Sequence, residues 1–167
     1  MKTAQLTIRT LVVCFVVLTL IGCTGRITLN AELDMGGKAG RRPLAKYNVY
    51  LLSDSIKSPE MEEAFRKYMS ATTRPVKFDV PLEEKNIRTR AGFMLSEGKA
   101  IWQRYLIERA ETNLQGKVKF RTTLKPGDYW IYCIVQRDTG WLLWNVKAPV
   151  EFYERTHVTL NEQNILQ

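Results

Sequence analysis

Histidine is the scarcest of the common catalytic residue types in this 167-residue sequence, which contains only His157. A zinc peptidase site needs two histidines and a carboxylate, and a Ser-His-Asp triad would have to recruit the same residue. The sequence also lacks G-x-S-x-G and the nucleotide-binding motifs G-x-x-x-x-G-K-[ST] and G-x-G-x-x-G. We therefore expect no enzyme, no cofactor and no metal site. A zinc site combining His157 with a cysteine and carboxylates is conceivable, but no spacing supports it, and His157 is interpreted as a partly exposed strand residue.

Local pairs of carboxylates are few. Glu83 and Glu84 are adjacent, and Glu108 and Glu111 are three residues apart on an expected helix, where they can lie near each other. The two carboxylates of a glycosidase need not be close in sequence, so spacing does not exclude that activity. Nothing else in the sequence points to it.

The sequence has no apolar run long enough to cross a bilayer. Leu11–Ile21 contains eleven apolar or small residues, which span about 16 Å as a helix, roughly half of a bilayer's hydrocarbon core. Lys2 and Arg9 precede this run, and polar residues follow it. A positive start with a short apolar run is typical of an export signal.

Leu20-Ile21-Gly22-Cys23 resembles the lipobox of bacterial lipoproteins. The resemblance implies a signal peptide over 1–22, cleavage after Gly22, diacylglycerol on the Cys23 sulfur and acylation, for example by palmitate, of the new amino terminus. Two or three acyl chains hold a protein to a membrane stably. By the enterobacterial sorting rule, Thr24 does not signal retention at the inner membrane. The expected location is the cell envelope, at the periplasmic or outer face of the outer membrane in a Gram-negative cell. The alternative is a secretory signal with Cys23 at the cleavage point.

Cysteine and charge define the mature chain further. Loss of Cys14 and lipidation of Cys23 leave Cys133 alone, so no intramolecular disulfide can form, and Cys133 is interpreted as a small buried hydrophobe. Removing Lys2 and Arg9 from the formal charge of +8 leaves +6. The basic residues are scattered. They suit anionic headgroups, acidic glycans or a solvated exterior, and no nucleic-acid partner is expected.

The period of apolar residues changes twice along the chain. Alternation predicts strands before residue 52 and after Gly116, and helical spacing predicts a helix from Pro59, capped by Ser58, and a longer one over 87–106. The expected strands cover 27–33, 46–52, 118–122, 129–136, 141–146, 150–153 and 157–160. This order predicts a mainly β fold, a single domain over 23–167 formed by an immunoglobulin-like or prealbumin-like β-sandwich of about seven strands with a helical insertion over about 56–111.

Two stretches carry a family resemblance. Thr112–Phe120 with Leu124–Ile131 resembles the "T-D-x-x-G-x-F-x-F … L-x-P-G-x-Y-x-L" hairpin of the carboxypeptidase regulatory-like domain, and Pro43–Leu51 resembles its "P-L-A-G-V-x-V-x-L" strand. The resemblance implies a seven-stranded prealbumin-like sandwich that supplies no catalytic residue. Independently of the family, Gly116 suits a positive φ, and Tyr129 can bury its ring while its hydroxyl bonds nearby backbone.

Aromatic residues near the C-terminus allow two interpretations. Trp130, Tyr132, Trp141 and Trp144 can form a platform for sugar rings, or the inserted helices can cover the sheet face that carries them. Covering is the simpler interpretation, because the helices also need a surface for their own apolar residues. The expected function is a non-enzymatic envelope lipoprotein with a protein partner. The alternatives are a carbohydrate- or peptidoglycan-binding lipoprotein and, last, an exported enzyme with an unfamiliar site.

Overall fold

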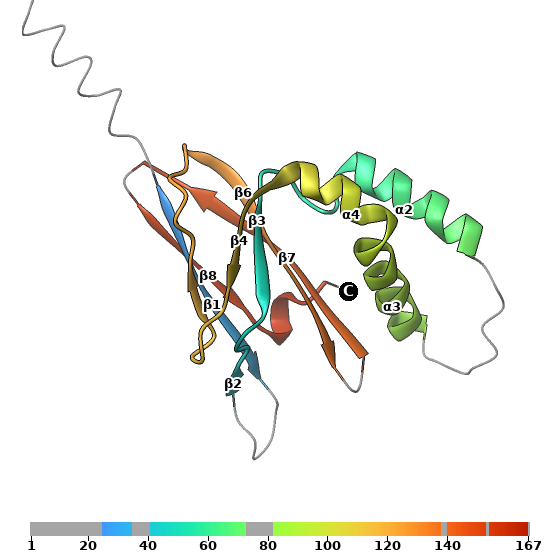
Figure 1. The fold of residues 1–167 in the computed structure, drawn as a ribbon, viewed down its shortest axis with the longest axis horizontal. Helices are drawn as coiled ribbons and strands as arrows, with labels where there is room; N and C mark the ends of the chain where they lie inside the picture. The colour runs from blue at the N-terminus through green and yellow to red at the C-terminus, as the bar shows by residue number, and fades with distance from the viewer. Residues whose placement is uncertain (1–24, 35–40, 73–81, 138–139, 153, 167) are drawn as a thin grey trace, which may run out of the picture.

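The architecture is organised around a four-stranded antiparallel sheet with strand order β4-β3-β6-β7 (Figure 1). The computed structural model describes residues 25–34, 41–72, 82–137, 140–152 and 154–166. The longest strands of this sheet pair along their whole length, from Gly127 opposite Val150 to Arg137 opposite Gly140. The four strands are β3 (Asn48–Leu52), β4 (Leu106–Glu111), β6 (Gly127–Arg137) and β7 (Gly140–Val150).

A second sheet is built around β1 (Arg26–Asp34). The short strands β5 (Lys117–Lys119) and β2 (Arg41–Pro43) pair antiparallel with successive parts of β1. The last strand, β8 (Arg155–Leu160), pairs parallel with β1, with Arg26 opposite Arg155. This parallel pair places the first and last described strands side by side (Figure 1).

The two sheets enclose one apolar cluster. Alternate residues of β6, namely Ile131, Cys133 and Val135, face this cluster and are at most 1% exposed. Trp144 lies in the same cluster, and its indole Nε1 donates to the carbonyl of Asn161 at 2.8 Å. A sandwich of two sheets with a shared core is therefore confirmed.

Helices cover the other face of the β4-β3-β6-β7 sheet (Figure 1). They are α2 (Pro59–Thr72), α3 (Leu82–Leu95) and α4 (Glu97–Trp102). A short 3-10 helix follows α4 at Gln103–Tyr105, and another follows β8 at Glu162–Asn164. Tyr132 and Leu143 from the sheet pack with Met61, Phe93 and Trp102 from the helices. The molecule thus has three layers. None of the helices in its described part is long and apolar enough to cross a membrane.

The start of α2 confirms a local prediction. The Ser58 hydroxyl accepts from the backbone N–H of Met61 at 3.4 Å, and Glu60 and Glu62 lie in the first turn. Both features stabilise a helix N-terminus, because free N–H groups and the positive end of the helix dipole meet oxygen and negative charge there.

Four of the expected element assignments differ from the structure. The expected helix over 87–106 breaks at Ser96, and residues 106–111, assigned to the helical insertion, form β4. Apolar spacing in this segment fits either period, and the open edge of β3 decides the outcome, since Val49 pairs with Ala110 and Asn48 with Glu111. The strand expected over 141–146 is longer and forms β7, while Glu151 and Phe152, expected in a strand over 150–153, lie outside it. Residues 41–43, outside the expected strands, form the short strand β2.

Thr112 holds the turn between β2 and β3. Its hydroxyl donates to the carbonyl of Leu44 and accepts from the N–H of Tyr47 at 3.1 Å, and its carbonyl accepts from the N–H of Lys46 at 2.9 Å. Within this turn Lys46 has a φ of +60°, a conformation in which Cβ crowds the following carbonyl oxygen. Gly116, the residue expected at positive φ, has a φ of +72°.

We predict that Lys46→Gly stabilises the protein by about 1 kcal/mol, because glycine removes the cost of a left-handed backbone and loses part of the gain through its freer unfolded chain. Urea unfolding would measure the change. Lys46→Ala is the matched control, since it removes the charge and retains the strain. An equal gain in both variants would show that the charge of Lys46, and not its backbone, is unfavourable.

Candidate functional site

A hollow of about 280 Å³ lies where α2, α3, β7 and the C-terminal segment meet. Its inner part is apolar, because Leu143 and Leu166 are nearly buried and Phe65 is half-buried. Its polar residues come from α3. The hollow is lined by Phe65, Asn86, Ile87, Arg90, Leu143 and Leu166.

The C-terminal segment closes one side of the hollow. The backbone N–H of Leu166 donates to the carbonyl of Leu143 at 2.7 Å, and Ile165 forms a β-bridge with Trp144. These contacts add a short strand-like segment to the edge of β7. As a result Leu166 reaches the helix-facing cluster, while Ile165 packs against the cluster between the sheets.

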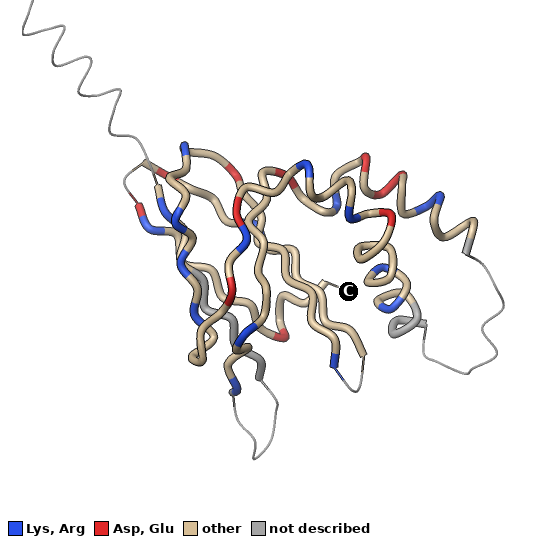
Figure 2. Tube along the Cα trace, in the orientation of Figure 1, with Lys and Arg blue, Asp and Glu red and all other residues tan. Residues whose placement is uncertain are grey.

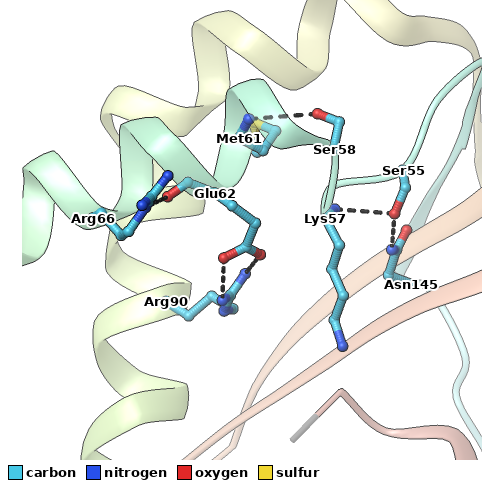
Figure 3. Close-up of polar contacts among 8 residues, drawn as sticks. All are labelled: Ser55, Lys57, Ser58, Met61, Glu62, Arg66, Arg90 and Asn145. Atoms are coloured by element: carbon cyan, nitrogen blue, oxygen red, sulfur yellow. Dashed lines mark hydrogen bonds and ion pairs between the residues drawn. The ribbon is translucent and has the colours of Figure 1, made fainter.

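Arg90 is held in one position at the rim of the hollow. Its guanidinium donates to both carboxylate oxygens of Glu62, at 2.8 and 3.2 Å (Figure 3). Its Cζ atom also lies 4.3 Å from the centre of the Phe65 ring. The hydrogen bonds from Arg90 hold the pKa of Glu62 below its usual value, although partial burial opposes this shift. A bidentate ion pair with a cation–π contact therefore joins α2 to α3.

A second polar group lies beneath the start of α2. Asn145 donates through Nδ2 to the Ser55 hydroxyl at 2.7 Å, and that hydroxyl accepts from the N–H of Lys57 at 3.0 Å (Figure 3). Asn145 Oδ1 and the hydroxyl of Tyr132, its cross-strand partner, are buried without a hydrogen-bond partner among the described residues. Burial raises the pKa of the Tyr132 hydroxyl far above its usual value, so it stays protonated.

The chemistry of the hollow suits binding. Asn86 and Arg90 offer hydrogen-bond donors at the rim, and the apolar floor offers contact area, a combination common to small-ligand sites. Glu62, the carboxylate beside Arg90, already accepts two bonds from it. Within the described part of the chain, no three His, Cys, Asp or Glu side chains gather as metal ligands.

The structure does not bring the four predicted platform residues together. Tyr132 and Trp144 are fully buried and lie on opposite faces of the sheet, so neither can stack on a sugar at the surface. Trp130 and Trp141 are half-buried. Strand alternation puts them on one face, but Trp141 pairs with Gln136, six residues or roughly 20 Å along β6 from Trp130. The prediction that these residues form a shared platform is therefore wrong. The helices cover Tyr132, as the simpler interpretation expected.

The acidic pairs also differ from expectation. Glu108 and Glu111 lie on β4 and not on a helix. Burial alone would raise the pKa of Glu108, but its carboxylate accepts from the N–H groups of Arg121 and Thr122 at 2.8 to 2.9 Å, and these bonds hold the pKa below its usual value. Glu108 thus has a structural role. The side chains of Glu83 and Glu84 lie outside the described residues.

Three further residues were singled out by the sequence, namely His157, Cys133 and Cys23. His157 is exposed on β8, as predicted, with Nδ1 2.6 Å from the Thr28 hydroxyl. Cys133 is fully buried, as predicted, and burial raises the pKa of its thiol to about 12. Cys23, the expected lipid-attachment residue, lies outside the described residues, which begin at Gly25.

The hollow could not be predicted from the sequence, because its lining comes from four separate segments and only their packing brings them together. One signal was present. The apolar periodicity locates the faces of α2 and α3 that pack on the sheet, including Phe65 and Phe93. A charged residue beside such a face, such as Arg90, indicates where the packed surface ends.

We predict that Glu62→Gln lowers the free energy of unfolding by about 1 kcal/mol at pH 7, since the charged pair with Arg90 is lost. Because the folded pKa of Glu62 lies below its unfolded value of 4.5, its contribution is complete above pH 4.5 and disappears as pH falls through the folded pKa. The two proteins should therefore converge in acid-dependent denaturation curves. Glu63→Gln is the control, because the ion pair of Glu63 with Lys67 is exposed to solvent. A difference independent of pH would contradict the role of the Glu62 charge.

Comparisons with known proteins found no matching family model and no matching curated protein. Among solved structures, the chain is similar to the crystal structure of a proposed carbohydrate-binding protein from Pseudomonas aeruginosa. The two are 15% identical, with a TM-score of 0.42, and the match covers 84% of this chain and 90% of that one. A likeness this distant carries no argument about function.

Proposed function

We propose that the protein is a lipoprotein of the bacterial cell envelope, held to a membrane by acyl chains on Cys23, whose domain binds a protein partner and catalyses no reaction. The observation that carries this proposal is the junction between leader and domain. Leu20–Cys23 resembles a lipobox, and Gly25, two residues further on, already pairs with Leu124. A leader too short to span a bilayer thus ends where the first sheet begins.

We infer that the sandwich is of the prealbumin-like type of the carboxypeptidase regulatory-like domain. Three residues of the quoted hairpin have physical roles that support this inference. The Asn113 side chain accepts from the N–H groups of Gln115 and Lys117, a role equally open to the aspartate of the family pattern. Gly116 supplies the positive φ, and the Tyr129 hydroxyl donates to the carbonyl of Lys125 at 2.9 Å.

A protein partner is favoured over a reaction by the character of the polar groups. Arg90 at the rim of the hollow is already paired with Glu62, and Tyr132, the buried hydroxyl with a strongly raised pKa, faces the covering helices. Neither arrangement prepares a nucleophile or a base for substrate.

The anchor is tested by labelling cells with an alkyne analogue of palmitate. We expect the wild-type chain to take up label and pellet with membranes, and Cys23→Ser to lose both, because its side chain has no thiol to receive diacylglycerol. Cys133→Ser is the control and should label fully, since Cys133 is buried in the domain. Label on the Cys23→Ser chain, or a mature chain that retains residues 1–22, would refute the proposal.

The second candidate is a carbohydrate- or peptidoglycan-binding lipoprotein. The hollow favours it, because Asn86 and Arg90 supply the planar donors that pair with sugar hydroxyls, and its volume of about 280 Å³ approaches the range of small-ligand sites. For this candidate we predict that soluble muropeptides bind the mature protein in calorimetric titration and that Asn86→Ala weakens binding by about tenfold. Gln103→Ala, an exposed amide outside the hollow, should bind normally. No heat of binding in wild-type protein would remove this candidate.

A further inference from the structure

Three segments meet at the end of the molecule where the described chain starts. Gly25 exchanges two backbone hydrogen bonds with Leu124, at 2.9 and 3.2 Å, and Arg26 donates its N–H to the carbonyl of Glu154 at 3.4 Å. A side chain at position 25 would lie 2.2 Å from Val150 Cγ1 and 3.0 Å from the carbonyl oxygen of Glu151. The start of β1, the loop before β6 and the connection between β7 and β8 are therefore packed together. We call this the β1-start face.

The distance from this face to the anchor is limited by covalent geometry alone. Cys23 and Gly25 are separated by two peptide units, which reach at most about 7 Å when fully extended. If Cys23 carries the acyl chains, its backbone lies at the headgroup level of the bilayer. Gly25, fixed in the fold by Leu124, cannot then be further than this short reach from the headgroups.

The β1-start face exposes a large apolar side chain. Phe152, in the connection between β7 and β8, is 57% exposed, and the carbonyl oxygen of its neighbour Glu151 lies 3.0 Å from where a Cβ on Gly25 would be. Around it the face carries both signs of charge (Figure 2). The exposed charged residues are Arg26, Lys125, Glu151, Glu154 and Arg155. An aromatic ring among mixed charges suits zwitterionic headgroups, where the ring reaches the acyl boundary and the charges meet phosphate and amine groups.

We propose that the β1-start face docks on the phospholipid surface that holds the anchor, with the Phe152 ring inserted at the headgroup level. This inference rests on the proposed lipidation of Cys23. The occupant follows from the tether, because no other surface comes within about 7 Å of Gly25 by covalent necessity. Lys125 and Arg26 contact lipid phosphates, and Glu151 and Glu154 stay among the amines.

The turn between β4 and β5 provides a matched comparison away from the β1-start face. Leu114 lies in the turn between β4 and β5, and β5 pairs with Thr28–Asn30, several residues along β1 from Gly25. At 67% its side chain is at least as exposed as that of Phe152, at 57%, but it lies beyond the part of β1 from Gly25 to Asn30. Docking of the β1-start face puts Phe152 in lipid and Leu114 in water, and it directs the helices away from the attachment point of the chain (Figure 1).

The test uses the mature lipidated protein, purified from membranes and reconstituted in vesicles of phosphatidylethanolamine and phosphatidylglycerol. The photoreactive residue p-benzoylphenylalanine replaces Phe152 in one variant and Leu114 in the other. After irradiation, mass spectrometry measures the acyl mass at Cys23 and any phospholipid adduct elsewhere. We expect phospholipid adducts from the variant at position 152 and none from the variant at position 114.

The outcomes separate the two proposals. An acylated Cys23 with no adduct at position 152, or with equal adducts at both positions, overturns the docking and leaves the lipoprotein proposal intact. A mature chain with no acyl mass on Cys23 overturns the lipoprotein proposal and removes the tether from which the docking follows. Near-ultraviolet circular dichroism of both variants confirms that they are folded, so that a negative result counts against docking.

Discussion

The structure depends on one constraint, which is that the β4-β3-β6-β7 sheet has apolar side chains on both faces and must be covered twice. Along Trp130–Val135 every residue is apolar or aromatic, so strand alternation sends three such side chains to each side. One side packs on the second sheet and the other on the helices. Since burial of this area is the main source of folding energy, the helical insertion is a structural layer and not an appendage.

The alternation of apolar residues predicted most of the strands, the two-sheet sandwich and the burial of Cys133, but not β2 or β4. Local turn chemistry predicted the positive φ of Gly116 and the backbone hydrogen bond of the Tyr129 hydroxyl, because both depend on residues close in sequence. Residues 106–111 were mispredicted because their pairing partner, β3, lies far away in sequence. The aromatic platform failed likewise. A strand shows which residues share a face, but not which face another layer covers.

The three-layer arrangement keeps the start of β1 and the hollow apart, and the two regions differ in their contacts. The start of β1 is bonded directly to neighbouring backbone, while the hollow lies at the junction of α2, α3 and β7. The Arg90–Glu62 pair organises that junction, because it joins α2 to α3 beside the apolar cluster that both helices share. A partner recognised there would meet an organised surface and would not need to order it first.

The short segment Ile165–Leu166 has a consequence for self-association of the domain. β7 is the last strand of its sheet, and its free backbone groups at Leu143 and Trp144 are paired by the chain's own C-terminus. An unpaired sheet edge templates association with a second copy. By pairing this stretch of β7, Ile165 and Leu166 remove part of that template, so substitutions that detach them are expected to make the domain self-associate through β7.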